Sequence, residues 1–252
     1  MSRAIVTGAS GGLGLEFAKL LAADKYDLVL VARSADKLEA IATQLHDEHG
    51  VRVETIALDL SLPDAAKTVF ARVPECDVLI NNAGFATNGR FDEIPETRIR
   101  EEIMLDVLTL TELTRAYLPG MRARGAGRIM NVASTAAFLP GPFMAVYYAA
   151  KAFVLSFTQA LAQELRGTGV TATTFCPGAT ATGFASRAGV EGTRLFRIGT
   201  AKADAVARAG YRGMQAGRDL VVPGLSNKAI ALSVRLTPRR LLVWLSGKLV
   251  EQ

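Results

Sequence analysis

Short apolar runs alternate with longer helical stretches through the first two-thirds of the chain, and this alternation restricts the fold more than any other feature. Six of the runs are "AIVTG", "YDLVLVAR", "VRVETIALDL", "CDVLINNAG", "GRIMNVAS" and "VTATTFCPG", and we expect a late strand at "RDLVVPG". Strands that are apolar on both faces and separated by helices are typical of a parallel sheet covered on both sides. Because parallel strands are joined by right-handed crossovers, the pattern predicts an α/β fold with a doubly wound sheet.

The whole chain, residues 1–252, is expected to form a single domain. It shows no internal repeat of fixed period and no break after residue 150 that would begin a second unit. Half of its residues are apolar, which is enough for a sizeable core. Residues 225–252 follow the last predicted strand as a basic, apolar helical tail.

Composition and charge argue against several classes of protein. The net charge is +5, but the basic clusters "MRARGAGR" and "TPRR" are not interleaved with aromatic residues, so nucleic-acid binding is not expected. Cys76 and Cys176 have neither disulfide nor zinc spacing, and His46 and His49 lie on a charged helix, so no metal site is expected. The N-terminus lacks the apolar run of a secretory signal, and a reducing, cytoplasmic location is the simplest interpretation.

A glycine-rich loop, "TGASGGLG", follows the first predicted strand and opens the first helix. Gly8, Gly12 and Gly14 have the spacing G-x-x-x-G-x-G. Without Cβ atoms the turn can be tight and the backbone can approach a pyrophosphate, which the free N–H groups of the helix then bind. A turn without a ligand is the alternative, but the place of this loop after the first strand favours a dinucleotide.

The second predicted strand ends at Ala32 and Arg33, where a fold that selects NAD usually offers an acid to the ribose 2′-hydroxyl. Here the guanidinium of Arg33, assisted by Ser34 and Lys37, suits a 2′-phosphate instead. The alternative is that Arg33 is merely a solvated residue at a helix start. NADP(H) is favoured as the cofactor, and NAD(H) is possible.

Together these motifs resemble those of the short-chain dehydrogenase/reductase family, over about residues 3–224. "NNAG" is similar to the motif on the family's fourth strand, and "YYAAK" to its Y-x-x-x-K. Ser134 in "NVAS" lies thirteen residues before Tyr147, and "CPGATAT" resembles the family segment that contacts nicotinamide. The resemblance implies a Rossmann-type sheet and the cofactor-binding residues Gly8, Ser10, Gly12, Leu13, Gly14, Arg33, Ser34, Asp59, Leu60, Asn82, Ala83, Gly84, Tyr147, Lys151, Pro177, Gly178, Thr180 and Thr182.

The resemblance also implies the catalytic roles. Tyr147 would be the general acid in carbonyl reduction and the base in alcohol oxidation, and Ser134 would hold the substrate oxygen. Lys151, one helical turn after Tyr147, would bind the nicotinamide ribose and lower the pKa of the tyrosine together with the positive ring. Tyr148 points elsewhere and is expected to pack or to form pocket wall.

One departure concerns the fourth helix, where the family usually carries an asparagine that shapes a water relay to the lysine. This chain has Asp106, which accepts hydrogen bonds but cannot donate as an amide does. If the backbone carbonyl holds the water, the relay survives. Asp106 is therefore a candidate fourth catalytic residue.

The expected activity is that of an oxidoreductase that interconverts a ketone or aldehyde and an alcohol on an apolar substrate, such as a 3-oxoacyl, steroid or aromatic compound. Phe138, Phe143 and Phe184 are predicted to line the pocket, with Leu139, Met144 and Phe196 nearby. The segment "GFASRAGVEGTRLF" is a candidate lid. The alternative is a nucleotide sensor or scaffold that kept the fold without the chemistry, although such a protein is expected to lose the tyrosine or the lysine.

Two surfaces suggest partners. The fourth and fifth helices are expected to form a homodimer or homotetramer; Phe153, Phe157, Leu161 and Leu165 recur along the fifth, unless this stripe faces the sheet. Pro238 is expected to divide the tail into two helices, the first ending near Thr237. These helices could pack over the pocket, pair with another subunit or make peripheral contact with an anionic membrane.

Overall fold

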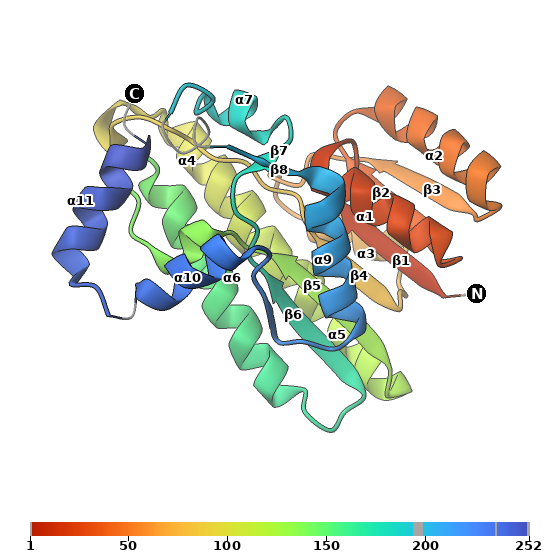
Figure 1. Ribbon diagram of the computed structural model, residues 1–252. Coiled ribbons are helices and arrows are strands. Elements are labelled where there is room, and N and C mark those ends of the chain that lie inside the picture. Colours follow the sequence, from red (N-terminus) through yellow and green to blue (C-terminus); the bar gives the residue numbers. More distant parts are fainter. Residues whose placement is uncertain (1, 194–198, 235, 251–252) are drawn as a thin grey trace.

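The computed structural model describes residues 2–193, 199–234 and 236–250, and within them a seven-stranded sheet has the order β3-β2-β1-β4-β5-β6-β9 (Figure 1). All neighbouring strands in this sheet are parallel. The strands are β1 (Arg3–Thr7), β2 (Asp27–Ala32), β3 (Val53–Ala57), β4 (Val78–Asn81), β5 (Gly127–Val132), β6 (Val170–Phe175) and β9 (Leu220–Val221). The doubly wound sheet predicted from the sequence, including its late strand, is confirmed.

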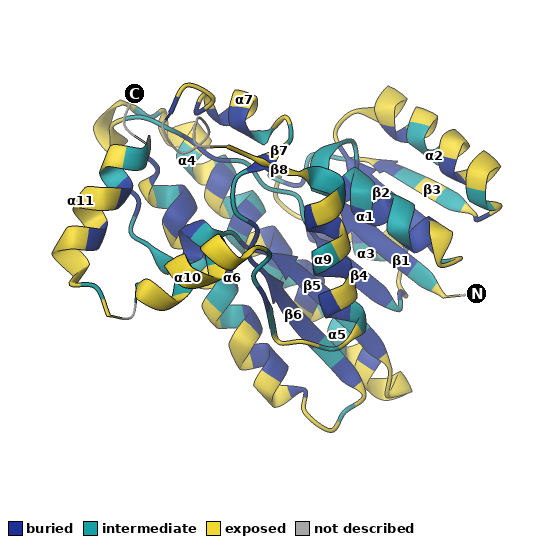
Figure 2. Ribbon diagram, viewed as in Figure 1, coloured by how far each residue is buried: buried dark blue, intermediate teal, exposed yellow. Residues whose placement is uncertain are grey.

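Helices cover both faces of the sheet. One face carries α1 (Gly12–Ala23), α2 (Ala35–His49) and α9 (Ala203–Gln215), and the other carries α3 (Ala65–Arg72), α5 (Leu110–Arg124) and α6 (Ala145–Glu164). Figure 2 shows the buried sheet between these partly exposed layers. In β1, Val6 packs into one apolar layer and Ile5 into the other, both with no exposed surface, because successive strand residues point to opposite faces.

The order of the strands determines where a ligand is expected to bind at the edge of the sheet. β1 lies between β2 and β4, so the chain winds outward in one direction from β1 and then in the other. The loops after β1 and β4 therefore diverge at the carboxyl ends of the strands and leave a crevice between them.

The fourth helix contains an irregular turn. Helix α4 (Glu96–Ile103) continues into α5 through a π-helical segment, Met104–Thr109. This segment contains Asp106, and π-helical turns occur frequently at functional sites.

Two further parts of the chain lie beyond the core layers. A small sheet pairs β7 (Thr180–Ala181) with β8 (Ala201–Lys202), and α7 (Phe184–Ala188) lies between them in the chain. Helix α7 occupies the predicted lid segment. Among the described residues, no helix is long and apolar enough to cross a membrane.

The tail forms two helices, α10 (Leu225–Ser233) and α11 (Arg239–Val250), which are separated at Pro238 as predicted. The prediction that the first helix ends near Thr237 is wrong, because it ends at Ser233. There the Ser233 carbonyl accepts hydrogen bonds from the N–H groups of Leu236 and Thr237, which close a turn ahead of the proline. A residue before proline disfavours helical backbone, which favours an end to the helix ahead of Pro238.

Candidate active site

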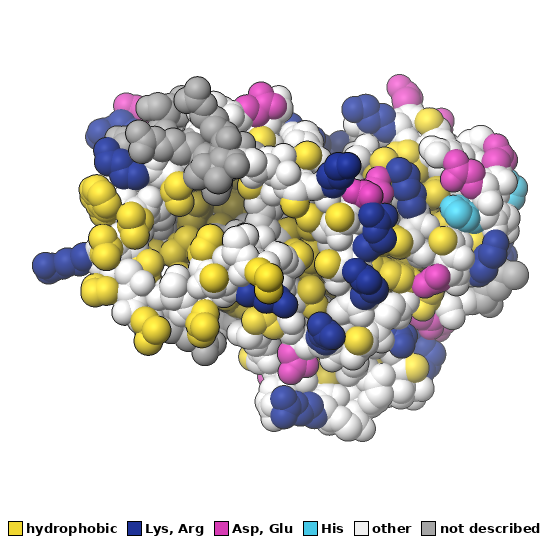
Figure 3. All heavy atoms as spheres, viewed as in Figure 1, with side chains coloured by type: hydrophobic (Ala, Val, Ile, Leu, Met, Phe, Trp, Pro, Cys, Tyr) yellow, Lys and Arg dark blue, Asp and Glu magenta, His cyan; other side chains and the backbone are white. Residues whose placement is uncertain are grey.

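A cavity of about 1390 Å³ runs along the carboxyl ends of the strands, and part of its mouth is visible as a hollow in Figure 3. The segments that follow β1, β2, β3, β4, β5 and β6 all contribute to its wall, and α10 and α11 border it at one end. A single cavity therefore joins the glycine loop, the Y-x-x-x-K segment and the tail.

The glycine loop is built for close approach. Gly8 and Gly12 have φ angles of 67° and 58°, in the left-handed region that favours glycine. A Cβ atom at Gly14 would lie 2.3 Å from the Gly8 carbonyl oxygen, so Gly14 lets α1 pack onto the loop rather than facing the cavity. The first turn of α1 has no side-chain cap, which leaves its N–H groups for a ligand.

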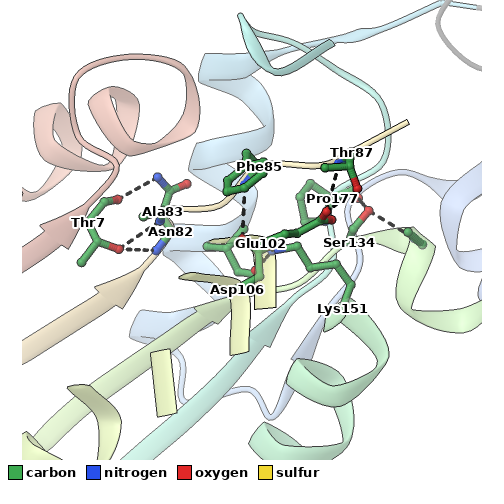
Figure 4. A network of polar contacts seen from close by, with 12 residues as sticks. Thr7, Asn82, Ala83, Phe85, Thr87, Glu102, Asp106, Ser134, Lys151 and Pro177 are labelled. Atoms are coloured by element: carbon green, nitrogen blue, oxygen red, sulfur yellow. Dashed lines mark hydrogen bonds and ion pairs between the residues drawn. The ribbon is translucent and has the colours of Figure 1, made fainter. Parts of the chain in front are cut away.

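Polar contacts between β1 and β4 hold the loop in place (Figure 4). The Thr7 hydroxyl oxygen accepts hydrogen bonds from the N–H groups of Asn82 and Ala83, at 2.9 and 3.0 Å. The Asn82 side chain donates to the Thr7 carbonyl at 2.8 Å. These contacts fix the two strand ends that a dinucleotide would bridge.

The predicted cofactor residues converge on this cavity, apart from Gly14. Those that line it are Gly8, Ser10, Gly12, Leu13, Arg33, Ser34, Asp59, Leu60, Asn82, Ala83, Gly84, Tyr147, Lys151, Pro177, Gly178, Thr180 and Thr182. The glycine backbone, the open helix N-terminus and this lining fit a dinucleotide.

The far end of the dinucleotide site is basic. Ala32 ends β2 and Arg33 follows it, so the strand end carries no carboxylate, and the Arg33 side chain is 68% exposed. Arg33 Nη1 lies 3.9 Å from Asp59 Oδ2. Partial burial opposes ionisation of Asp59, but hydrogen bonds from Ser61 and the nearby Arg33 hold its pKa below the usual value. Arg33 thus retains an exposed guanidinium at this end of the cavity.

At the other end, Ser134, Tyr147 and Lys151 all line the cavity. Lys151 Nζ lies 5.5 Å from the centroid of the Tyr147 ring and donates to the Val132 carbonyl at 3.3 Å. Ser134 caps the short helical turn Thr135–Phe138, where its hydroxyl accepts from the Ala136 N–H at 3.1 Å. A phenol, a cation and a hydroxyl are thereby brought together on the helix and loop that follow β5.

Tyr148 is both packing and pocket wall. Its ring is nearly buried, lines the cavity and lies over Gly141, where a Cβ atom would approach the ring to 2.3 Å. It meets the Tyr147 ring edge-on, with the centroids 6.1 Å apart. Lys151 shares the helix face of Tyr147, not that of Tyr148.

Asp106 is paired directly with the lysine. Asp106 Oδ2 lies 2.9 Å from Lys151 Nζ, and Asp106 Oδ1 accepts from the Phe85 N–H at 3.2 Å. Both charged side chains are buried, and a Cβ atom at Gly84 would lie within 3.2 Å of the pair. Burial disfavours the charge of Lys151, but Asp106 raises the pKa of the ammonium, so the lysine stays protonated.

Glu102 is a site residue that the sequence-based prediction missed. It has no exposed surface and accepts hydrogen bonds from the backbone N–H and the hydroxyl of Thr87 (Figure 4). Its second carboxylate oxygen has no hydrogen-bond partner among the described residues. Burial, with the negative charge of Asp106, raises the pKa of Glu102 to about 7 although Thr87 opposes the rise. The sequence feature that could have identified Glu102 is its position four residues before Asp106, because residues at this spacing are neighbours on a helix surface.

The predicted effect of Lys151 on the Tyr147 pKa is present, but burial of the phenol acts against it. Burial raises the pKa of Tyr147 above its ordinary value, and the nearby carboxylates of Asp106 and Glu102 add to the rise. Lys151 and a hydrogen bond from Ser134 act in the expected direction but do not outweigh it. Asp106, which lies beside the ammonium, opposes the effect of Lys151 on the tyrosine.

The aromatic wall of the pocket differs in part from the prediction. Phe184 lines the cavity with its ring 5.4 Å from that of Tyr147, and Leu139 and Met144 also line it. Phe138 does not, because it packs against a buried cluster that includes Val154 and Cys176. Phe143 does not either, because it sits in a left-handed turn with 37% of its surface exposed. Phe196 lies outside the described residues.

No group of three His, Cys, Asp or Glu side chains that could hold a metal occurs in the described part of the chain. Cys176 is buried, and burial raises the pKa of its thiol to about 12, so a nucleophilic thiolate is disfavoured.

Comparison with known proteins defines the class. The short chain dehydrogenase family matches residues 2–191, and the chain belongs to this family of oxidoreductases. It is 37% identical over 173 residues to "Very-long-chain 3-oxoacyl-CoA reductase" from Rattus norvegicus, covering 66% of this chain and 55% of the relative. It is 36% identical over 212 residues to "Ketoacyl reductase HetN" from Nostoc sp., covering 81% and 74%. The chain thus spans about half the length of the first of these relatives.

Among solved structures, a short-chain dehydrogenase from Sphingobium yanoikuyae in complex with NADPH superposes with a TM-score of 0.85. It is 34% identical and covers 94% of each chain.

Proposed function

We propose that the protein is an NADPH-preferring reductase of an apolar ketone, with 3-oxoacyl thioesters as the favoured substrate class. The observation that carries the proposal is one continuous cavity that joins two groups of side chains. Tyr147, Lys151 and Ser134 line one end of it, and Arg33 lines the other. No acidic residue stands at the end of β2 to compete for Arg33 or to repel a 2′-phosphate. This arrangement would align a 2′-phosphorylated dinucleotide along the strand ends, with its nicotinamide beside the tyrosine.

Each of the three side chains would have its own role in the reduction. The bound nicotinamide would supply a hydride to the carbonyl carbon. Ser134 would donate a hydrogen bond to the carbonyl oxygen, and Tyr147 would transfer its phenolic proton to that oxygen. A raised tyrosine pKa keeps the proton on the phenol at neutral pH, which suits the acid required for reduction. Lys151, held charged by Asp106, would stabilise the tyrosinate that remains.

The substrate class is supported by the cavity wall. Leu139, Met144 and Phe184 flank Tyr147, and the tail adds Ile230, Leu242 and Trp244 farther out. An elongated apolar chain could lie along this surface with its oxo group at Ser134. Two relatives with names that specify oxoacyl or ketoacyl reduction support the same class.

The test is oxidation of NADPH, followed by absorbance, with 3-oxoacyl-CoA substrates of increasing chain length, steroid ketones and aromatic ketones. We expect kcat/KM to rise with acyl chain length and to be higher with NADPH than with NADH. Turnover confined to steroid or aromatic ketones would overturn the substrate class. Tight NADPH binding without turnover of any carbonyl compound would instead favour a non-catalytic sensor or scaffold.

A further inference from the structure

The tail helices expose an unusual share of the apolar surface. Fourteen large hydrophobic side chains are exposed in the described part of the chain, and eight of them lie between residues 225 and 245. These eight, which we call the tail patch, are Leu225, Ile230, Leu232, Leu236, Leu241, Val243, Trp244 and Leu245. A concentration of this kind indicates a surface that contacts an apolar partner.

The tail patch is held against the body of the protein. Ser246 on α11 is almost fully buried and donates a hydrogen bond to the Pro140 carbonyl, and Leu242 is buried one turn earlier. A Cβ atom at Gly247 would lie 3.3 Å from the Pro142 ring. Because one face of α11 is anchored in this way, its remaining apolar residues are presented outward on a fixed support.

The charged residues in the described part of the tail are of one sign. The described residues of 225–250 include Lys228, Arg239, Arg240 and Lys248 and no Asp or Glu. On α10, Lys228 lies on the same helix face as Leu225 and Leu232, which are 84% and 63% exposed. Helices with apolar residues flanked by cations bind at the interface of anionic lipids, whereas the core of a protein–protein interface is depleted of lysine.

The tail patch also borders the cavity. Ile230, Trp244 and Leu245 belong to the patch and line the cavity. Figure 3 shows apolar side chains around the hollow beside α10 and α11, with basic side chains at the outer edge. A surface that rests on lipid at this position would bring the opening to the membrane.

We propose that the tail patch docks the protein peripherally on an anionic lipid surface, so that the cavity opens toward the bilayer. The supply of an apolar substrate from the lipid rests on the proposed function, but the docking itself does not. Lys and Arg would lie at the level of the headgroups, and Leu225, Leu236 and Trp244 would enter the apolar boundary.

The experiment is sedimentation with vesicles of phosphatidylserine and phosphatidylcholine, and with vesicles of phosphatidylcholine alone. We expect binding to the anionic vesicles at low salt and release at high salt, because salt screens the attraction of the cations. The test variant is Leu225→Glu with Leu236→Glu, since both side chains are more than four-fifths exposed and neither lines the cavity. The matched control is Leu62→Glu with Phe91→Glu, which adds the same charge at exposed apolar residues far from the tail in sequence.

The test variant is expected to lose at least tenfold in apparent vesicle affinity, while the control variant binds as the unmodified protein does. Both should keep turnover of a small soluble ketone, which separates loss of docking from loss of the proposed activity. Failure of the unmodified protein to bind anionic vesicles would overturn the proposal, as would equal losses in the two variants. If light scattering showed that only the test variant dissociates an oligomer, without vesicle binding by the unmodified protein, the patch would be a subunit interface instead.

Discussion

At the scale of single residues, the two adjacent tyrosines should behave differently. Changing Tyr147 to Phe removes the proton that the carbonyl oxygen receives, so kcat/KM should fall by at least about a hundredfold. Tyr148→Phe should be far milder, because its ring packs over Gly141 away from Lys151. NADPH binding, followed by fluorescence titration, should persist in both variants. A larger loss at Tyr148 would reverse the assignment.

Asp106 sets the charge around the lysine. Asp106→Asn should retain activity or raise it modestly, because it restores the residue usual in the family. It removes a negative charge that raises the pKa of Tyr147, so the tyrosine limb of the pH–rate profile should move to lower pH. A loss beyond about a hundredfold, or roughly 2.7 kcal/mol of barrier, would give the carboxylate a specific catalytic role.

Glu102 should make stability depend on pH. Its pKa is raised by burial from 4.5 to about 7, so the folded state binds the proton more tightly than the unfolded state. The stability contributed by this proton is fully present below pH 4.5 and is lost as pH rises through about 7. Relative to Glu102→Gln, the free energy of unfolding should therefore fall by up to about 3 kcal/mol across this window. Urea unfolding of both proteins from pH 4.5 to 8 measures the difference, and parallel curves would show that Glu102 does not titrate there.

The sequence could bring the candidate catalytic residues together because strand ends and helix spacing determine their positions. Ser134 follows β5, and Tyr147 and Lys151 share a helix face, so local structure alone brings them to one edge of the sheet. The burial of Glu102 depends on how α4 packs against the loop that follows β4, which no local pattern specifies. The net direction of the Tyr147 pKa shift also depends on tertiary burial, which the spacing of Tyr147 and Lys151 does not specify.

At the scale of elements, the turn between β2 and α2 should decide which dinucleotide binds. Replacing Ala32 with Asp and Arg33 with Ala should shift the ratio of kcat/KM values toward NADH by at least about tenfold. The new carboxylate would repel the 2′-phosphate and accept from a 2′-hydroxyl, while the exposed guanidinium that pairs with the phosphate is lost. Specificity constants measured with both cofactors test this, and an unmodified enzyme that prefers NADH tenfold would rule out the NADPH proposal.

The predicted strands and the division of the tail follow from short-range patterns, since apolar runs and Pro238 act locally. The end of α10 was predicted four residues too late and the π-helical segment at Asp106 was not predicted, because both depend on contacts made by the folded chain. Phe138 and Phe143 illustrate the same limit. Both are apolar, as the wall of an apolar pocket requires, but the folded chain places neither of them in that wall. The turn at Gly141 to Met144 directs Phe143 toward solvent.

At the scale of the whole molecule, the apolar stripe on α6 explains where a second subunit could bind. Phe153, Phe157, Leu161 and Leu165 are spaced by four residues, and a helix turns by 100° per residue, so each step rotates the stripe by about 40°. The stripe accordingly begins at Phe153, 41% exposed and stacked on Phe157, and ends at the buried Leu161 and Leu165. The inner end of the stripe therefore faces the core, and its exposed outer end is where we expect a second subunit.

Exposed apolar residues at the end of α4 and in the π-helical segment that follows it extend this surface. Ile103 and Leu108 are 46% and 43% exposed, and α4 packs beside α6. We expect a homodimer or homotetramer by light scattering at micromolar concentration, with α4, its continuation into α5, and α6 at the interface; α6 is the fifth helix of the sequence-based prediction. Phe153→Glu should shift the protein toward the monomer, because a buried unpaired carboxylate destabilises an interface. The double variant at Leu225 and Leu236 serves as the control and should keep the same mass. If the unmodified protein were already a monomer, or if Phe153→Glu left the oligomer intact, these helices would not form the interface.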